Sequence, residues 1–222
     1  ESQIPYYYNA SGKIVPLSFN NSENYQLRVG GRKIKDFNQD GTIDNNDKYY
    51  AGSTLPSAFG GISNRVSYKN WTLDMMMSYT IRRKMMNMVK NSAFNFTKTF
   101  GTIMADPSKV TFWQKPGDVT DYPSLEFADQ GYIGQFDGDI DSNIENVNYL
   151  RLKSITLSYE MPAKWFKNKI KGLSLYVTGQ NLFLWTNYSG TDPEVVDPYT
   201  GKDTGQQYPL NRSVTFGFNL KF

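Results

Sequence analysis

The stretch Arg212-Ser-Val-Thr-Phe-Gly-Phe-Asn-Leu-Lys-Phe222 decides the fold of this chain. Its apolar residues lie on one parity and its small or polar residues on the other. Because successive side chains of an extended strand point to opposite faces, the stretch predicts a strand with one aromatic, apolar face and one polar face. A soluble β-sandwich also produces such alternation. Since this strand ends on an aromatic residue in a chain without cysteine, the pattern favours the closing strand of an outer-membrane β-barrel.

Four further segments have the length and pattern of strands. They are residues 58–68, 71–81, 147–160 and 173–185, and together with residues 212–222 they make a set of five. Each is close to the 9–11 residues that a tilted transmembrane strand requires, or somewhat longer. Only Lys69 and Asn70 separate the first two segments, which predicts a tight hairpin.

The apolar parity switches within two of these strands. In residues 147–160 it changes near residues 153–154, and a β-bulge there would bring both halves onto one face. In residues 173–185 it changes in the same way around residues 179–181. A strand that is buried on both faces in a soluble protein is the alternative explanation of such a mixed pattern.

The connections between the strands alternate in length. Residues 69–70 and 162–172 are short, whereas residues 82–146 and 187–211 are long and polar. Short periplasmic turns and long extracellular loops are typical of outer-membrane barrels. If residue 222 ends in the periplasm, both short turns fall on the periplasmic side and both long loops fall outside.

We therefore expect an all-β chain with two regions. Residues 1–57 would form an extracellular region of loops and strands, and residues 58–222 would form the last five transmembrane strands with their extracellular loops. Aromatic residues lie near both ends of the predicted strands, as two membrane-interface girdles would require. The alternative is that aromatic residues favour strands in general.

The composition excludes several classes of protein. The 222 residues include no Cys and no His, which excludes disulfide frameworks and thiol catalysis and removes the commonest general base. A net charge of +3 without a Lys/Arg run predicts no nucleic-acid partner. The chain has no stretch of about 18 apolar residues, so the sequence predicts no transmembrane helix. The first residues have no export signal, so we expect a mature exported protein or a fragment, and we favour a fragment.

The acidic segment 36–47 is the sharpest chemical motif. It has the D-x-[DN]-x-[DN]-G spacing of an EF-hand loop, with Gly41 at the sharp turn. Ca²⁺ prefers six to eight oxygen ligands. The expected structural calcium site consists of Asp36, Asn38, Asp40, Thr42, Asp44 and Asp47. Its last position is Asp rather than Glu, which lowers the expected affinity, and the alternative is an acidic surface turn held by side-chain-to-backbone hydrogen bonds.

No catalytic constellation stands out in the sequence. The carboxylates within residues 137–141 and 192–197 could suggest glycoside hydrolysis, but both groups lie in loops where solvated acidic turns are usual. Neither a G-x-S-x-G motif nor a phosphate-binding loop ending in Lys-Ser/Thr occurs. We therefore predict that the chain is not an enzyme.

A series of short motifs follows a familiar order along the chain. They are Lys35–Asp44, Ala51–Pro56, Tyr68–Asn70, Tyr149–Tyr159, Tyr176–Phe183, Gly190–Glu194 and Tyr208–Arg212. From about residue 24 to residue 222, the chain resembles the C-terminal region of the SusC/RagA-type TonB-linked outer-membrane transporters of Bacteroidetes. Gln180-Asn181-Leu182-Phe183 and Asp192-Pro193-Glu194 are specific in combination, whereas each short motif alone is weak.

The resemblance implies a fold and a function. The fold would be the C-terminal part of a 22-stranded antiparallel transmembrane β-barrel in the bacterial outer membrane, with a plug in its lumen. The function would be uptake of oligosaccharides or peptides, with a SusD-like surface lipoprotein as a lid and with energy supplied through TonB. This chain contains no candidate plug or TonB box, so TonB would act through a missing N-terminal part. Open sheet edges do not survive in lipid, so the remainder of the barrel is a further expected partner beside the outer-membrane lipid.

The two long loops are expected to face the lid protein and the ligand. Four aromatic residues are candidates for these contacts, because flat rings stack on sugars or pack against a partner: Trp113, Tyr122, Tyr132 and Phe136. The alternative is that these residues hold their own loop together. Two other functions compete with import: a soluble calcium-stabilised β-domain that binds carbohydrate, and a secreted glycosidase domain.

Overall fold

A computed structural model describes the protein in two compact units. The units are Glu1–Ala51 with Lys90–Asn143, and Gly52–Val89 with Ile144–Phe222. Residues 30–31, 34–89, 111–120, 124, 140–166, 171–197 and 199–221 are described, together with the backbone of four short strands before residue 27.

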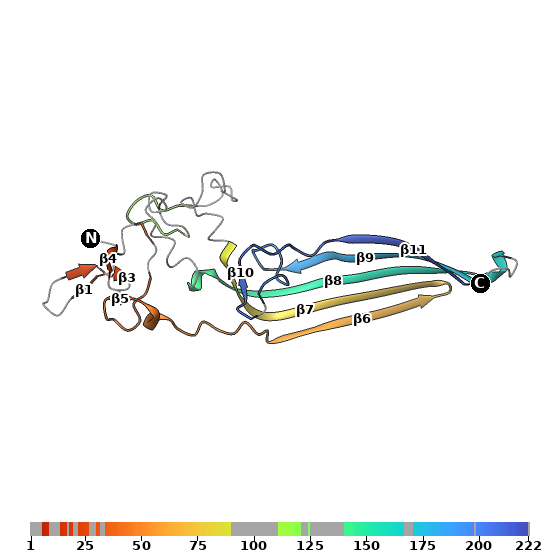
Figure 1. Ribbon diagram of the computed structural model, residues 1–222, viewed down its shortest axis with the longest axis horizontal. Helices are drawn as coiled ribbons and strands as arrows, with labels where there is room; N and C mark the ends of the chain where they lie inside the picture. The colour runs from red at the N-terminus through yellow and green to blue at the C-terminus, as the bar shows by residue number, and fades with distance from the viewer. Residues whose placement is uncertain are drawn as a thin grey trace. The chain divides into compact units, whose positions relative to one another are not determined.

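The second unit is a sheet of long antiparallel strands (Figure 1). In the order in which they pair, they are β6 (Ala58–Tyr68), β7 (Trp71–Asn87), β8 (Ile144–Met161), β9 (Gly172–Thr186) and β11 (Ser213–Lys221). A two-residue strand, β10 (Lys202–Asp203), pairs in parallel with the end of β7. These strands confirm the predicted all-β, antiparallel fold class.

The first unit contains shorter elements. They are β1 (Tyr6–Tyr8), β2 (Ile14–Pro16), β3 (Ser18–Phe19), β4 (Ser22–Gln26), β5 (Thr42–Ile43) and the 3-10 helices η1 (Asn45–Asp47) and η3 (Asp141–Asn143). A further 3-10 helix, η4 (Ala163–Phe166), follows β8 in the second unit. In the part of the chain that the structure describes, no helix has the length and apolar character needed to cross a membrane.

The predicted hairpin at Lys69 and Asn70 is confirmed. Tyr68 pairs with Trp71, and Lys69 adopts a φ of 54°, the positive value that the first position of a two-residue hairpin turn uses. The turn is also tied to β8, because Glu160 N donates to Asn70 O at 2.8 Å and Asn70 Nδ2 donates to Glu160 O at 2.7 Å.

The predicted bulge in β8 is confirmed and lies at Lys153. Met76 pairs with Ser154 and Met77 pairs with Leu152, so Lys153 has no opposite residue in β7. A bulge places one extra residue in a strand and shifts the alternation behind it. Apolar residues on both sides of Lys153 therefore reach the same face of the sheet, although their parity differs.

A matching irregularity lies in β9, where the second parity switch was predicted. On this side of β8, Leu152 pairs with Phe183 and Ser154 pairs with Gln180, which leaves residues 181–182 without opposite residues. Asn181 adopts a φ of 52° at this position. The two irregularities face each other, but only β8 changes parity. Because two residues are left out in β9, odd-numbered residues such as Val177 and Phe183 lie on the apolar face on both sides of it, so the predicted parity switch in β9 is wrong although its position is irregular.

β7 continues past an irregularity between Thr80 and Arg83 that the sequence pattern did not reveal. Thr80 pairs with Tyr149 and Arg83 pairs with Val147, with Arg82 at a φ of 53° between them. Alternation read directly from the sequence stops at this point, which is why the expected strand 71–81 ends six residues before β7 does. The first residues of the expected loop 82–146 are consequently strand.

Directly paired residues share a face of a sheet, so the register defines two faces. Cross-strand rows of one face, which we call the apolar face, include Tyr68, Trp71, Tyr159, Leu175 and Phe218, and also Val66, Leu73, Leu157, Val177 and Phe216. Rows of the opposite face, the polar face, include Ser67, Thr72, Ser158, Tyr176 and Gly217, and also Arg65, Asp74, Thr156, Thr178 and Thr215.

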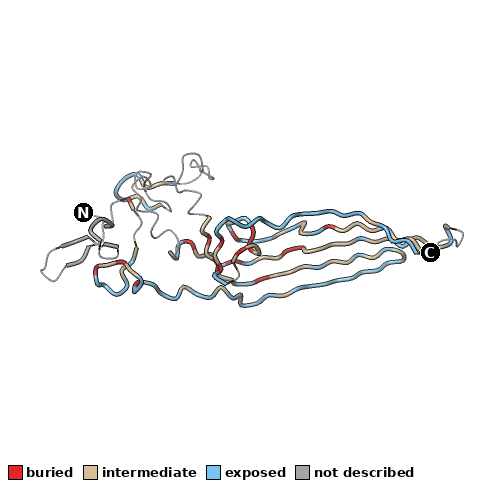
Figure 2. The backbone as a smooth tube through the Cα atoms, in the orientation of Figure 1, coloured by how far each residue is buried: buried red, intermediate tan, exposed pale blue. Residues whose placement is uncertain are grey.

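The apolar face is exposed along the strands. Phe216 and Phe218 retain 79% and 67% of their accessible surface. Figure 2 shows that the buried residues of this sheet gather at the end where β10 lies, while most of the strand length is intermediate or exposed. The sheet is therefore not the wall of a conventional soluble core.

Candidate functional site

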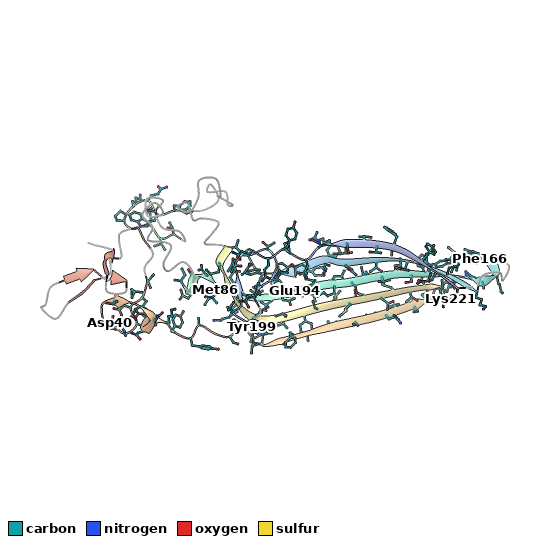
Figure 3. The ribbon with its side chains drawn as sticks, viewed as in Figure 1. Asp40, Met86, Phe166, Glu194, Tyr199 and Lys221 are labelled. Carbon is teal, nitrogen blue, oxygen red and sulfur yellow. The ribbon has the colours of Figure 1, made fainter. Side chains whose placement is uncertain are left out.

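The loop between β9 and β11 folds back onto the polar face. Loop residues Tyr188 and Val196 form a buried cluster with Met85 of β7 and Val147 of β8. Val147 and Met85 lie in the register that continues the polar face beyond the irregularity at Arg82. Figure 3 shows the labelled loop residues Glu194 and Tyr199 at the same end of the sheet as Met86, whereas Lys221 lies at the other end. The loop therefore covers one end of the polar face.

Four charged side chains join the loop to the sheet, and we call them the charge cluster: Arg151, Lys153, Asp192 and Glu194. Arg151 Nη2 donates to Asp192 Oδ1 at 2.5 Å. Arg151 Nε lies 2.5 Å from Glu194 Oε2, although the pair lacks the angles of a hydrogen bond. Lys153 Nζ donates to the same oxygen at 2.8 Å, and Ser78 Oγ donates to Glu194 Oε1 at 3.2 Å.

The charge cluster has a buried centre, with Lys153 and Glu194 half-buried around it, and it is electrically balanced. Arg151 and Asp192 retain 2% and 5% of their accessible surface. The two positive groups and two negative groups sum to zero, so no unpaired charge is left in the interior. Because a buried charge without a partner is costly, each member of the cluster depends on the others.

Asp192 also organises the loop itself. Its Oδ1 accepts a hydrogen bond from Glu194 N at 3.0 Å, which makes the tight turn through Pro193. Its Oδ2 accepts from Leu210 N at 3.3 Å, near the point where the chain enters β11. One carboxylate therefore holds both branches of the loop against Arg151.

The bulge in β8 explains how two cations reach one carboxylate. Arg151 pairs with Ser78 and faces the polar side of the sheet. Lys153 reaches the same side, because its ammonium contacts Glu194 together with Arg151 and Ser78. Beyond the bulge, Ile155 returns to the apolar face. A regular strand could not present Lys153 and Ile155 to opposite faces.

A second set of polar contacts holds the loop near the buried apolar cluster. Tyr188 Oη donates to Asp203 Oδ2 at 2.6 Å. Burial first, and then this hydrogen bond and the nearby negative charges, raise the pKa of the Tyr188 hydroxyl far above its ordinary value. Asn87 Nδ2 donates to Glu145 Oε1 at 3.1 Å and to Ser189 Oγ at 3.0 Å. These contacts tie the start of the loop to the ends of β7 and β8.

The tip of the loop is exposed, unlike its base. Asp197 Oδ1 accepts from Tyr199 N at 2.8 Å and from Thr200 N at 3.3 Å. These backbone donors, Tyr199 first, lower the pKa of the Asp197 carboxyl. Tyr199 retains 92% of its accessible surface. Its side chain is therefore available to a partner or a ligand.

The interpretation of residues 192–197 as a solvated acidic turn is wrong for two of its three carboxylates. Asp192 and Glu194 are buried against Arg151 and Lys153, and only Asp197 matches the expectation. The sequence signal for this arrangement was the presence of two cations among apolar residues in the middle of β8. Spacing alone could not link them to acids some 40 residues later.

The structure describes one of the four predicted aromatic contact residues. Trp113 is half-buried in the first unit, with its ring against the backbone of Gly30, so close that a Cβ on Gly30 would lie 2.8 Å from Trp113 Cε3. This packing accounts for the position of Trp113 without a ligand. Tyr122, Tyr132 and Phe136 lie outside the described residues, and a role of all four in binding stays a prediction.

The acidic segment 36–47 binds its own backbone. Asp36 accepts from Gln39 N at 2.7 Å and from Gly41 N at 2.9 Å. Asp47 accepts from Phe37 N and Asp44 N, each at 2.8 Å. The remaining acceptors follow the same scheme: Asn38 binds Asp40 N, Asp40 binds Thr42 N, and Asp44 binds Asn46 N.

These hydrogen bonds account for the local shape of the acidic segment. Gly41 makes the predicted sharp turn with a φ of 86°. Within the described part of the chain, no three His, Cys, Asp or Glu side chains lie close enough together to hold a metal ion. The calcium ligand set Asp36, Asn38, Asp40, Thr42, Asp44 and Asp47 stays a prediction.

Three similarities place the chain among known proteins, while no family model matches it. It is 31% identical over 207 residues to TonB-dependent receptor P26 of Formosa agariphila, covering 87% of the chain and 20% of the relative. It is 30% identical over 191 residues to TonB-dependent receptor SusC of Bacteroides thetaiotaomicron, covering 84% and 17%. Among solved structures, the RagAB peptide transporter matches with a TM-score of 0.57 and 28% identity, over 79% of the chain and 19% of that structure's chain.

The sheet of this chain is antiparallel, with one exposed apolar face and one polar face. The fold matches part of the RagAB peptide transporter. The chain is homologous to the TonB-dependent transporters of the SusC and RagA type along most of its length. It spans about a fifth of the length of the curated relatives it matches. The relatives are receptors and transporters rather than enzymes, which confirms the prediction that the chain is not an enzyme.

Proposed function

We propose that this chain is part of the wall of a TonB-dependent importer in the bacterial outer membrane. In this proposal the apolar face of β6 to β11 meets lipid, and the polar face lines the path of the ligand. The observation that carries the proposal is the exposed apolar face, on which Phe216 and Phe218 have no core to cover them. The soluble carbohydrate-binding domain is not favoured, because such a domain would bury these rings.

The two ends of the sheet support an orientation. The short connections at Lys69-Asn70 and after β8 lie at one end, which we assign to the periplasm, and the long connections leave the strands at the other end. Paired aromatic rings occur near both ends, with centroid separations of 4.7 Å for Trp71 and Tyr159 and 5.8 Å for Phe183 and Trp185. Such rings suit the two membrane interfaces.

The strand lengths support the same orientation. β7 has 17 residues and β8 has 18, whereas about 9–11 residues span the hydrocarbon. The surplus lies beyond Arg82, where Met85 and Val147 are buried under the loop after β9. We infer that this end of the sheet stands above the membrane on the extracellular side.

The edges of the sheet imply further strands. Among the strands that the structure describes, β6 pairs with β7 alone and β11 pairs with β9 alone. Unpaired edges are not stable in lipid, so further strands of the same protein would continue the sheet into a closed barrel of about 22 strands.

Ligand and partners are proposed from the relatives. One relative is a peptide transporter by name and another is SusC. We infer that oligosaccharides or peptides are the ligand class, that a SusD-like lipoprotein forms a lid over the loops, and that TonB supplies energy through a part of the protein outside this chain.

Two neighbouring residues of β11 test the proposal in the full-length protein. Phe216→Arg places a charge on the apolar face, and Thr215→Arg places the same charge on the polar face as a matched control. An arginine facing lipid near the bilayer centre costs about 2–4 kcal/mol. We expect Phe216→Arg to reduce the heat-modifiable, membrane-inserted form, while Thr215→Arg leaves it near the normal level.

The opposite ranking of these two variants would contradict the proposal, as would recovery of the unaltered protein in the soluble fraction. Import is tested separately, by growth and uptake on a panel of peptides and glycans with and without TonB. Uptake that is indifferent to TonB would remove the importer assignment.

A further inference from the structure

The loop after β9 has three attachments to the sheet, two on the polar face and one at the edge of β7. The charge cluster joins Asp192 and Glu194 to β8. The apolar cluster places Val196 over Met85 and Val147. Strand β10 adds main-chain pairing to β7, with a further hydrogen bond from Met86 N to Gly201 O at 2.9 Å. The segment is therefore held at three places, by ion pairs, by apolar packing and by main-chain pairing.

We propose that residues 187–203 are a fixed lining of the transport path, with Arg151 and Lys153 as the residues that position it. This inference rests on the proposed function, because the polar face is the inner face only if the sheet is a barrel wall. The loop would narrow the path from one side and set an upper limit on the size of solute that passes. It would not act as an extracellular flap.

The burial of the attachments argues for a fixed position. Segments that open and close during function usually have few buried contacts and solvent-exposed hydrogen bonds. Here the opposite holds at the base of the loop, where Arg151, Asp192 and Val196 are all buried. Separating Asp192 and Glu194 from Arg151 would leave charges without partners in a poorly solvated place. The loop should therefore move with the sheet.

Cysteine labelling tests the attachment without reference to transport. These 222 residues contain no cysteine, so Val196→Cys in a full-length protein whose other parts are made free of cysteine gives one buried probe. We expect slow reaction with a water-soluble maleimide in intact outer membranes. Adding Asp192→Asn with Glu194→Gln should raise the rate about tenfold or more, because the ion pairs that close the loop are lost.

Asp197→Asn is the matched control for this experiment, since Asp197 is a carboxylate of the same loop that caps the exposed tip and lies outside the charge cluster. It should leave the slow rate unchanged. If the doubly neutralised protein fails to assemble, Arg151→Lys keeps the charge but loses the forked geometry, and an intermediate labelling rate is expected. Fast labelling of Val196→Cys in the otherwise unaltered protein, or equal rates in all variants, would overturn the attachment.

A disulfide tests whether the lining is fixed during transport. Val147→Cys with Val196→Cys joins the loop to β8 within one cluster. We expect ligand uptake to be the same in the oxidised and reduced states. Uptake that stops on oxidation and returns on reduction would show that the loop must move, which overturns the inference.

The size limit is measured in the same strains. The doubly neutralised variant should admit a bulky hydrophilic antibiotic, lowering its inhibitory concentration, whereas Asp197→Asn should not. Absence of uptake in the unaltered protein counts against the proposed function, while the labelling rates decide the attachment independently.

Discussion

At the scale of single residues, the attachment of the loop after β9 to the sheet depends most on Arg151. This side chain is buried on the polar face and contacts both acids of the charge cluster, Asp192 and Glu194. Arg65 makes a similar pair with Asp74 on the same face, but its side chain retains 73% of its accessible surface. The comparison separates a buried ion pair from an exposed one within one sheet.

We predict that Arg151→Met destabilises the full-length barrel by about 3–5 kcal/mol, because Asp192 is left buried without its charged partner while Glu194 keeps Lys153. Arg65→Met is the matched control and should cause no measurable change, since exposed pairs contribute little. Thermal and urea unfolding of the detergent-purified protein measures both. Equal stability of the two variants would contradict the burial argument.

At the scale of elements, the bulge at Lys153 sets the faces of half of β8. Shifting a strand by one residue sends every side chain behind the shift to the opposite face. The sequence revealed this element through the parity of Leu150 and Leu152 against Ile155 and Leu157. The similar irregularity at Arg82 was not predicted from the sequence, because charged residues follow it and no alternation of apolar residues marked the change.

Deleting Thr156 from the regular part of β8 should therefore prevent assembly, because Leu157 and Tyr159 would turn toward the polar face. Lys153→Ala keeps the extra residue, loses only the ammonium bonded to Glu194, and should still assemble. The fraction of heat-modifiable protein in outer membranes measures the difference. Normal assembly of the deletion variant would mean that the register of β8 can adjust elsewhere.

Calcium binding by the acidic segment 36–47 is a prediction that a substitution can test. Asp40→Asn keeps an oxygen that can accept from Thr42 N, and it removes one negative charge. If calcium binds here, this variant should bind it about tenfold more weakly, since affinity follows the number of charged ligands.

Asp118→Asn changes a carboxylate that caps a separate turn, and it serves as the control. Calorimetric titration of calcium into the metal-free protein measures all three proteins. No heat of binding in the unaltered protein, or equal affinities in both variants, would leave the segment as a turn stabilised by its own backbone.

At the scale of the whole molecule, the sequence predicts what is local and misses what is not. Alternation within each strand, the two-residue hairpin and the parity switch follow from neighbours along the chain. The return of the loop onto the sheet depends on Arg151 meeting Asp192, and no periodicity connects such distant residues. Composition suggested a solvated turn because acidic, Gly- and Pro-rich loops are usually exposed. The fold class was therefore predictable, and the charge cluster was not.

The zero sum of the charge cluster has a consequence for selectivity. Four ionised groups cancel one another over a short patch, and their field fades quickly with distance from it. An anionic oligomer and a cationic one would feel the same potential as they pass this patch. Any selectivity for the charge of the solute must then originate elsewhere in the protein. At this patch, the solute would be selected by its cross-section.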